Sequence, residues 1–218
     1  ELKSTIKNLG FDTLTPVQQE TIPAIIRGED VIVQAKTGSG KTISFVLPIM
    51  EKLTSKNKNP KVLVIAPTRE LCEQIASVFR SLGTFVQNLK VVTLYGGVSL
   101  RGQVVNMAHG VDVVIGTAGR LNDHIFRETL VLETIETLVL DEADRMLDMG
   151  FFDDIMKVIN RIKNKPQTML FSATYPSNIE KLTSNIMKNP TMIKIQTDCV
   201  VEIEEYLYKV KDKYQALL

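Results

Sequence analysis

The chain has 218 residues, of which 44% are hydrophobic, so it is long enough to bury one ample core. Its 26 Lys and Arg residues against 25 Asp and Glu residues leave a formal net charge of +1, which excludes polyanion binding by bulk charge alone. No apolar run approaches the roughly 20 residues of a membrane span, so we expect a soluble protein of the cytoplasm or nucleus without a membrane partner.

Short runs rich in β-branched residues recur along the chain and predict strands. In chain order these runs cover residues 31–34, 61–67, 89–95, 112–117, 136–142, 167–173 and 191–197. Segments with helical periodicity separate most of them, for example 69–82 and 151–164. This alternation, with several strands almost continuously apolar, predicts an α/β domain whose mostly parallel sheet has helices on both faces.

The sequence AKTGSGKT joins the first predicted strand to a predicted helix over residues 43–53. A phosphate-binding loop requires this context, because its glycines let backbone N–H groups turn toward an anion at a helix N-terminus. Lys41 would bring charge to the β- and γ-phosphates, and the Thr42 hydroxyl would bind Mg²⁺. The predicted nucleotide-binding residues of this loop are Ala35, Lys36, Thr37, Gly38, Ser39, Gly40, Lys41 and Thr42.

An acidic pair, Asp141 and Glu142, comes at the end of the fifth predicted strand. Such a pair loses hydration energy on burial unless it meets a cation. Asp141 would hold the Mg²⁺ bound to Thr42, and Glu142 would orient and deprotonate the water that attacks the γ-phosphate. The preference of helix N-termini for acidic residues also explains the pair, but its combination with the phosphate loop favours catalysis.

Residues 141–144 read DEAD, and over nearly its full length the chain resembles the DEAD-box RNA helicases. The resemblance implies the RecA-like fold of P-loop NTPases, and the family's phosphate loop usually starts with alanine, as Ala35 does here. The other similar segments occur in the family's order: the Q motif GFDTLTPVQ (10–18), the RNA-contact segments PTREL (67–71), Gly96-Gly97 and TAGR (117–120), and the coupling motif SAT (172–174).

The resemblance implies ATP as the nucleotide, with Mg²⁺ as its metal. Gln18 would read adenine, because an amide offers both a donor and an acceptor to N6 and N7, and Phe11 would flank the base. The simpler alternatives are a solvated helix residue for Gln18 and a hydrophobic staple for Phe11. The guanine-specific pattern NKxD is missing, since the nearest stretch, 164–167, reads NKPQ, and this favours ATP over GTP.

The resemblance also implies a sequence-independent site for single-stranded RNA or a short duplex. Arg69 and Arg120 would bind phosphates by charge, although ordinary surface arginines are the simpler alternative. The chain has no Trp, and we find no aromatic residue in these loops, so we expect contacts to the RNA backbone rather than base stacking. The implied RNA-binding residues are Pro67, Thr68, Arg69, Gly96, Gly97, Thr117, Gly119 and Arg120.

The coupling residues implied by the family are Asp144, Ser172, Ala173 and Thr174. Ser172 and Thr174 would hydrogen-bond Asp144 and pass the nucleotide state to the RNA face, although hydroxyl residues after a strand also serve as helix caps. One departure is Ala118, where the family usually has proline. Because proline fixes φ and removes a donor, alanine there predicts a less constrained loop.

Residues 1–197 are expected to form the N-terminal RecA-like domain, and residues 198–218 a linker and the start of a truncated second RecA-like domain. The arginine motif HRxGRxxR, which the family carries on that second domain, is absent from this chain. Arginine fingers are worth about 10³–10⁵ in rate, so we expect slow ATP hydrolysis by the chain alone. The whole protein would close both domains on RNA, separate short duplexes or displace proteins, and use protein cofactors.

Two other functions remain open at this stage. An ATP-gated RNA clamp would use the same motifs but would hold RNA without separating strands. In a P-loop ATPase that moves DNA or protein, Gln18 would not need to read adenine, and Arg69 and Arg120 would not need to bind RNA. A P-loop kinase is least favoured, since no stretch resembles a lid or an acceptor-substrate site.

Overall fold

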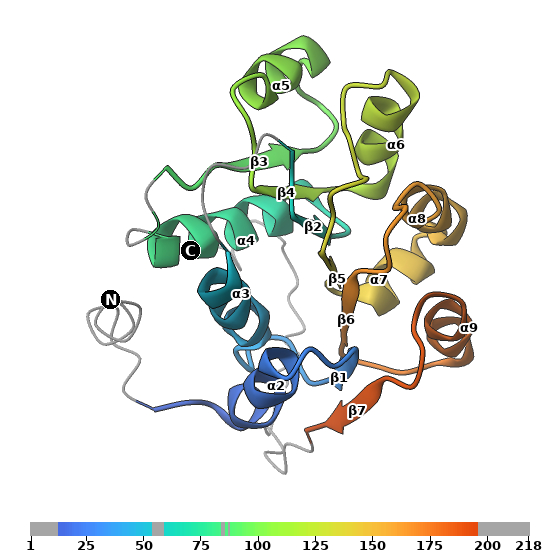
Figure 1. Ribbon diagram of the computed structural model, residues 1–218. Helices are drawn as coiled ribbons and strands as arrows, with labels where there is room; N and C mark the ends of the chain where they lie inside the picture. Colours follow the sequence, from blue (N-terminus) through green and yellow to red (C-terminus); the bar gives the residue numbers. More distant parts are fainter. Residues whose placement is uncertain (1–12, 54–58, 84–85, 87, 196–218) are drawn as a thin grey trace, which may run out of the picture.

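The computed structural model of the chain describes residues 13–53, 59–83, 86 and 88–195 (Figure 1). Phe11, together with the start of the motif at 10–18, lies outside these residues, as does the segment 198–218 assigned to a second domain. Within the described part of the chain, no helix combines the length and the apolarity needed to cross a membrane.

Every predicted strand forms, and all neighbouring strands pair in parallel. Across the sheet the strand order is β3-β4-β2-β5-β6-β1-β7. Most strands are shorter than predicted at one or both ends; the acidic pair Asp141 and Glu142, for example, belongs to the loop after β5. The strands are β1 (Val31–Gln34), β2 (Val62–Ile65), β3 (Val91–Leu94), β4 (Val113–Gly116), β5 (Thr137–Leu140), β6 (Gln167–Ser172) and β7 (Thr191–Lys194).

Helices cover both faces of this sheet, as predicted (Figure 1). The helix predicted at 69–82 forms over that range, whereas the one predicted at 151–164 ends at Ile159, before a segment rich in asparagine and lysine. The helices are α2 (Pro16–Ile26), α3 (Lys41–Lys52), α4 (Arg69–Leu82), α5 (Leu100–Met107), α6 (Ala118–Phe126), α7 (Ala143–Asp148), α8 (Phe152–Ile159) and α9 (Ser177–Ile186).

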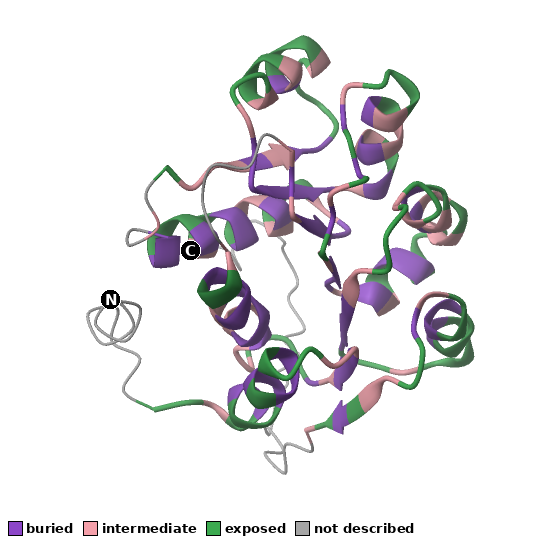
Figure 2. Cartoon of the chain, in the orientation of Figure 1, coloured by how far each residue is buried: buried purple, intermediate pink, exposed green. Residues whose placement is uncertain are grey.

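Two apolar cores sandwich the sheet, because successive residues of a strand point to opposite faces. Val62 and Val64 of β2 pack under α2, α3 and α4, whereas Leu63 and Ile65 pack under α6 to α9. Burial therefore runs almost throughout the inner strands (Figure 2), which is why they read as continuous apolar sequence, whereas the edge strands β3 and β7 are only partly buried. The helices on both faces hold the strands rigidly and leave only their ends for a binding site.

The carboxyl ends of the strands all lie along one edge of the sheet, because every pairing is parallel. Open parallel sheets bind ligands at this edge, where strands give way to helix N-termini. The motifs of the described chain follow β1, β2, β3, β4, β5 and β6 at this edge. The fold thus gathers segments that are distant in sequence.

Gly116 ends β4 directly before the segment 117–120 and leaves no room for a side chain. A Cβ there would lie 2.7 Å from Leu94 O and 2.9 Å from carbons of Leu121. We therefore predict that Gly116→Ala lowers the free energy of unfolding by about 1–3 kcal/mol, as overpacking does. Urea denaturation measures this change.

The matched control for that measurement is Gly102→Ala. A Cβ at position 102 of α5 comes no closer than 3.9 Å to another group, Cβ of Ser99. Alanine in a helix should be neutral or stabilising there. Equal unfolding free energies for wild type and Gly116→Ala would contradict the close packing of β4 against β3 and α6.

Candidate functional site at the carboxyl edge of the sheet

The loop between β1 and α3 has the geometry of a phosphate cradle. Gly38 and Gly40 have φ values of 80° and 95°, which glycine adopts without strain. Gly40 is the N-cap of α3, and the first turn of this helix has no acidic residue to compete with an anion. The N–H groups of that turn and the positive end of the helix dipole therefore face the loop.

Lys41 and Asp141 are buried charged residues whose charges interact at this loop. Lys41 is 7% exposed, and its Nζ donates a hydrogen bond of 2.8 Å to Ala35 O. Burial raises the pKa of Asp141 to about 6, although the charge of Lys41 and the N–H of Glu142 act to lower it. A cation bound beside Asp141 would favour the charged carboxylate.

Glu142 adopts a strained backbone conformation immediately after β5. Its φ and ψ of 50° and 51° lie in the left-handed region, which costs a residue with a side chain about 1–3 kcal/mol. Its N–H donates to Asp141 Oδ1 over 2.9 Å, and its Oε2 lies 3.4 Å from Arg145 Nη1. Strain of this kind concentrates at functional sites, and here it turns the chain between the two carboxylates of the acidic pair.

Gln18 is only 3% exposed and lies against the phosphate loop. Its Oε1 accepts a hydrogen bond from Thr15 N over 3.0 Å, and its Nε2 donates to Gly40 O over 3.3 Å. A Cβ at Gly40 would come within 2.6 Å of that Nε2, so glycine is required there for space as well as for its φ. This position excludes the alternative of a solvated helix residue, and the amide ties α2 to the loop.

Two buried hydroxyls beside the loop fit a site that binds a ligand. Thr15 Oγ1 and Ser39 Oγ have no hydrogen-bond partner within the described residues. Thr15 Oγ1 would lie 3.1 Å from a Cβ at Gly40, so it borders the loop directly. Buried polar atoms are nearly always satisfied, and a ligand or water would complete both. Thr15 was not among the predicted site residues, although Thr15 followed by Pro16 is a typical helix start.

Asp144 connects α7 to the loop after β6. Its Oδ2 accepts hydrogen bonds from Ala173 N (3.1 Å), Thr174 N (2.9 Å) and Thr174 Oγ1 (3.0 Å). Burial acts to raise the pKa of Asp144, but the donors, Thr174 foremost, lower it overall. Ser172 Oγ is near enough to help lower this pKa, yet it forms no standard hydrogen bond, a weaker contact than expected.

The segment 172–174 also touches the phosphate loop. Ala35 N donates to Ser172 O over 3.0 Å, and Gln34 Nε2 lies 3.5 Å from Ala173 O. This short segment therefore contacts the phosphate loop on one side and Asp144 on the other. A movement of the loop has a direct hydrogen-bonded route to α7.

The candidate RNA residues occupy a separate part of the same edge. They follow β2, β3 and β4, which are neighbours at one end of the sheet, whereas the nucleotide and coupling motifs follow β5, β6 and β1. Pro67 is buried here, while Gly96, Gly97 and Gly119 are exposed. The structure thus gives the two groups of motifs adjacent but distinct places.

Arg69 is an exposed cation supported by an aromatic ring that sequence analysis overlooked. Its guanidinium carbon lies 5.0 Å from the centre of the Tyr95 ring, and Tyr95 Oη donates to Glu73 Oε1 over 2.8 Å. We expected no aromatic residue in these loops, but Tyr95 directly precedes Gly96. Because this ring is only 8% exposed, it positions Arg69 instead of offering a face for base stacking.

Both candidate threonines begin helices. Thr68 Oγ1 accepts a hydrogen bond from Leu71 N over 3.2 Å and caps α4, which leaves the hydroxyl proton free to be donated elsewhere. Thr117 is the N-cap residue of α6 without a side-chain cap, and its N–H donates to Leu94 O over 3.0 Å. Ala118 is the first, buried residue of α6, a position that suits proline equally well.

Arg120 is bound within the protein rather than free on its surface. Its Nη1 donates to Val98 O over 3.0 Å and to Gln103 Oε1 over 2.8 Å, and its Nε lies 3.4 Å from Asp123 Oδ2. The side chain is 13% exposed. In this arrangement Arg120 holds the loop that contains Gly96 and Gly97, a role that its sequence did not reveal.

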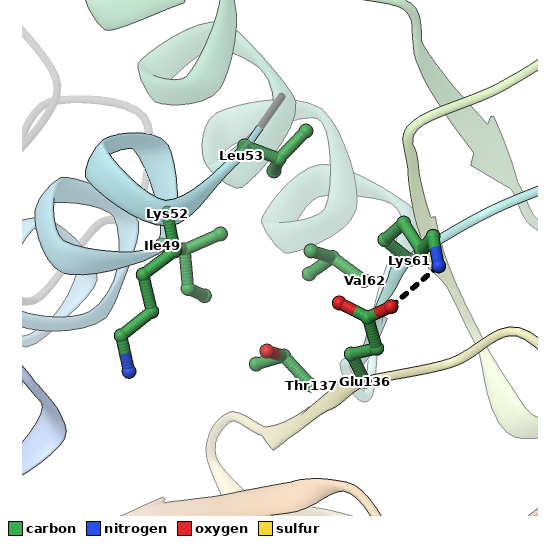
Figure 3. Close-up of a pocket in the computed structure, with 7 residues that line it drawn as sticks. All are labelled: Ile49, Lys52, Leu53, Lys61, Val62, Glu136 and Thr137. Carbon is green, nitrogen blue, oxygen red and sulfur yellow. Dashed lines mark hydrogen bonds and ion pairs between the residues drawn. The ribbon is translucent and has the colours of Figure 1, made fainter. Parts of the chain in front are cut away.

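A cavity of about 200 Å³ lies at the opposite edge of the sheet, between the end of α3 and the starts of β2 and β5 (Figure 3). Lys61 and Glu136 form an ion pair in its wall. Lys52 Nζ donates to Ile25 O over 2.8 Å and to Gln167 Oε1 over 3.1 Å. Since these charges are partnered, we assign no ligand to it. The lining residues are Ile49, Lys52, Leu53, Lys61, Val62, Glu136 and Thr137.

Comparison with curated proteins gives relatives along almost the whole chain. ATP-dependent RNA helicase CshA of Listeria monocytogenes is 40% identical over 215 residues, which cover 98% of this chain and 41% of that protein. ATP-dependent RNA helicase DbpA of Escherichia coli is 42% identical over 211 residues, which cover 96% of this chain and 46% of that protein. The chain therefore spans less than half the length of these relatives.

Solved structures share the fold. The crystal structure of a DEAD box protein from Methanococcus jannaschii has a TM-score of 0.86 and 37% identity, with 89% of this chain and 53% of that chain covered. The crystal structure of a hypothetical ATP-dependent RNA helicase from Sulfolobus tokodaii has a TM-score of 0.82 and 38% identity, with 89% of this chain and 56% of that chain covered. These matches confirm the RecA-like fold. Since the family model for DEAD/DEAH box helicases matches residues 15–182, this chain belongs to that family.

Proposed function

We propose that this chain is the N-terminal core domain of an ATP-dependent RNA helicase. The whole protein would hydrolyse ATP and grip the RNA backbone to unwind short duplexes or remodel RNA–protein complexes. The observation that carries this proposal is the arrangement of two motif groups on one edge of the sheet, linked through Asp144 and the segment 172–174. The names of the relatives, ATP-dependent RNA helicases, support it.

ATP would bind with its phosphates in the loop 35–42 and its adenine beside Gln18. The loop N–H groups and Lys41 neutralise phosphate charge. Thr42 and Asp141 would hold Mg²⁺, which would offset the charge of the phosphates. Among the described residues no group of three or more His, Cys, Asp or Glu is placed to hold a metal ion. Mg²⁺ requires none, since it usually binds through one or two carboxylates, substrate phosphates and water.

Glu142 would orient the attacking water and take its proton. Its carboxylate is paired with Arg145, whose side chain is 61% exposed, and such exposed pairs contribute little free energy. The carboxylate is therefore free to exchange this partner for the water. The arginine fingers that complete such a site would come from a second RecA-like domain of the same protein.

RNA would bind across the ends of β2, β4 and β3 through its phosphates. Arg69, held over Tyr95, presents an exposed charge, and the exposed glycines let backbone N–H groups approach closely. Contacts of this type read no base sequence, so the choice of RNA would rest with protein cofactors or further segments.

Nucleotide selectivity tests this proposal first. With Mg²⁺ present, the chain should bind ATP and ADP more tightly than GTP and GDP by about 1–3 kcal/mol, the discrimination expected of a bidentate amide. Gln18→Ala should lose this preference, since the donor and the acceptor disappear together. Isothermal titration calorimetry gives all four affinities.

Gln19→Ala provides the control for that titration, because the neighbouring amide is exposed and donates only to Leu14 O among the described groups. It should keep the selectivity of the wild type. Equal affinities of the wild type for adenine and guanine nucleotides would leave a phosphate loop without a base reader, and a general P-loop ATPase would then be favoured.

The contact of Asp144 with Thr174 predicts coupling between nucleotide and RNA. Thr174→Val removes one of the three bonds to Asp144 Oδ2, and this should reduce the gain in RNA affinity on ATP binding by about fivefold, or 1 kcal/mol. Nucleotide affinity should stay within about twofold, because the hydroxyl lies outside the phosphate loop. RNA anisotropy titrations with and without a non-hydrolysable ATP analogue, on protein that includes the second domain, measure it.

Ser184→Ala is the matched control, since this exposed hydroxyl of α9 bonds only Lys181 O among the described residues. It should leave the coupling unchanged. The same enhancement in Thr174→Val as in wild type would contradict the role assigned to the Asp144 contact.

A further inference from the structure

The helix α5 is anchored by a polar side chain. Gln103 is its only buried residue, at 5% exposure, whereas Val105 of the same helix is 60% exposed. A surface helix ordinarily turns an apolar stripe toward the core. The amide of Gln103 therefore anchors α5 together with Met107, a partly buried residue that packs against the apolar core on this face.

This amide joins groups from two other segments. Its Nε2 donates to Tyr95 O over 3.2 Å, while its Oε1 accepts from Arg120 Nη1 over 2.8 Å and lies 3.0 Å from His124 Nε2. Because Oε1 only accepts, the contact with His124 requires a proton on Nε2. Thr129 Oγ1 lies 2.8 Å from Nδ1 of that histidine and 3.1 Å from the histidine's backbone oxygen, so the single hydroxyl proton can be donated to either of them. With this proton turned toward Nδ1, a neutral histidine satisfies the side-chain contacts.

The environment of His124 keeps this arrangement fixed. The side chain is fully buried, at 0% exposure. Burial lowers the pKa of His124, and the positive charges of Arg120 and Arg127 lower it further. The negative charge of Asp123 acts to raise this pKa but does not outweigh them. The imidazole therefore stays neutral near pH 7, and it contacts Gln103 from a fully buried position.

Apart from His124, the groups that Gln103 holds belong to candidate RNA segments or border them. Tyr95 O and Val98 O, the second held through Arg120, bracket Gly96 and Gly97. The Tyr95 ring lies under Arg69, so the same amide supports the backbone below that cation. One buried side chain thus connects three segments that would touch RNA, yet it is itself shielded from RNA.

We propose that Gln103, fixed by His124, is a positioning residue of the RNA site. It sets the place of Arg120 and of the carbonyls on either side of Gly96 and Gly97, and it makes no contact with RNA. The inference rests on the proposed RNA-binding function. A residue needed only for stability would change the free energy of unfolding, whereas a positioning residue changes RNA affinity while nucleotide affinity is kept.

Three substitutions separate these roles. Gln103→Leu keeps the approximate size but removes the bonds from this amide to Tyr95 O, Arg120 and His124. Gln103→Glu keeps an acceptor for Arg120 and His124, loses the donor to Tyr95 O and places a negative charge beside Arg120. Asn106→Ala alters an exposed residue of the same helix and is the matched control. If the leucine variant fails to fold, Gln103→Asn, which shortens the amide, replaces it with the same expectation.

The test is RNA affinity by fluorescence anisotropy, on protein that includes the second domain, with a labelled strand of about 10 nucleotides, a common single-strand site size. Gln103→Leu should weaken RNA binding about tenfold, since it leaves buried polar groups unpaired. Gln103→Glu should stay within about threefold and Asn106→Ala should match wild type, with nucleotide affinity by calorimetry unchanged in all. A folded leucine variant that binds RNA as tightly as wild type would overturn the inference.

Hydrogen exchange of the amides at 95–99 distinguishes this inference from the proposed function. If the wild type binds no RNA, the proposed RNA function fails, and the positioning role is then judged by exchange alone. Faster exchange in Gln103→Leu than in Gln103→Glu and Asn106→Ala supports the role of Gln103 in holding the loop. Equal exchange in all variants overturns that role.

Discussion

The parallel pairing of every strand in the described sheet is the constraint on which the candidate site depends. Parallel strands end at one edge, so the phosphate loop and the segment 172–174, far apart in sequence, become neighbours. Strand order then divides this edge, with nucleotide motifs after β5, β6 and β1 and RNA motifs after β2, β4 and β3. The apolar cores on both faces fix the strands, so the loops at their ends move on a rigid support.

Polar contacts, rather than apolar packing, join the parts of this edge. One carboxylate oxygen of Asp144 accepts three hydrogen bonds from the segment 172–174, which contacts the phosphate loop. In the RNA loops, the amide of Gln103 donates to Tyr95 O and accepts from Arg120. Hydrogen bonds to a charged group are stronger than neutral ones, yet they depend on direction. A small shift of the loop would therefore change these bonds before it changed the apolar core. This combination of a rigid sheet and directional contacts suits a domain that responds to its nucleotide.

The sequence predicted the strands and the phosphate loop because their signals are local: runs of β-branched residues, and glycines placed between a strand and a helix. Strand ends were predicted too far because residues next to the apolar runs, such as Ala66 after β2 and Asp141 after β5, carry no local signal of where strand pairing stops. Side-chain partners were beyond sequence reasoning. The contacts of Gln18 with Gly40 and of Arg120 with Val98 exist only because the topology brings separate loops together. The contact of the buried Tyr95 ring with Arg69 was missed for the same reason, since the two residues lie in separate loops of the sequence.

The central claim is that nucleotide and RNA both bind at the carboxyl edge of the sheet, in adjacent places. Hydrogen exchange measured with an ATP analogue and Mg²⁺, then with RNA added, tests this claim directly. The account predicts that nucleotide protects the amides at 35–42 and 172–174, and that RNA further protects those at 67–69, 96–99 and 117–120. Protection confined to the cavity at the opposite edge, around Lys61 and Glu136, would contradict the account.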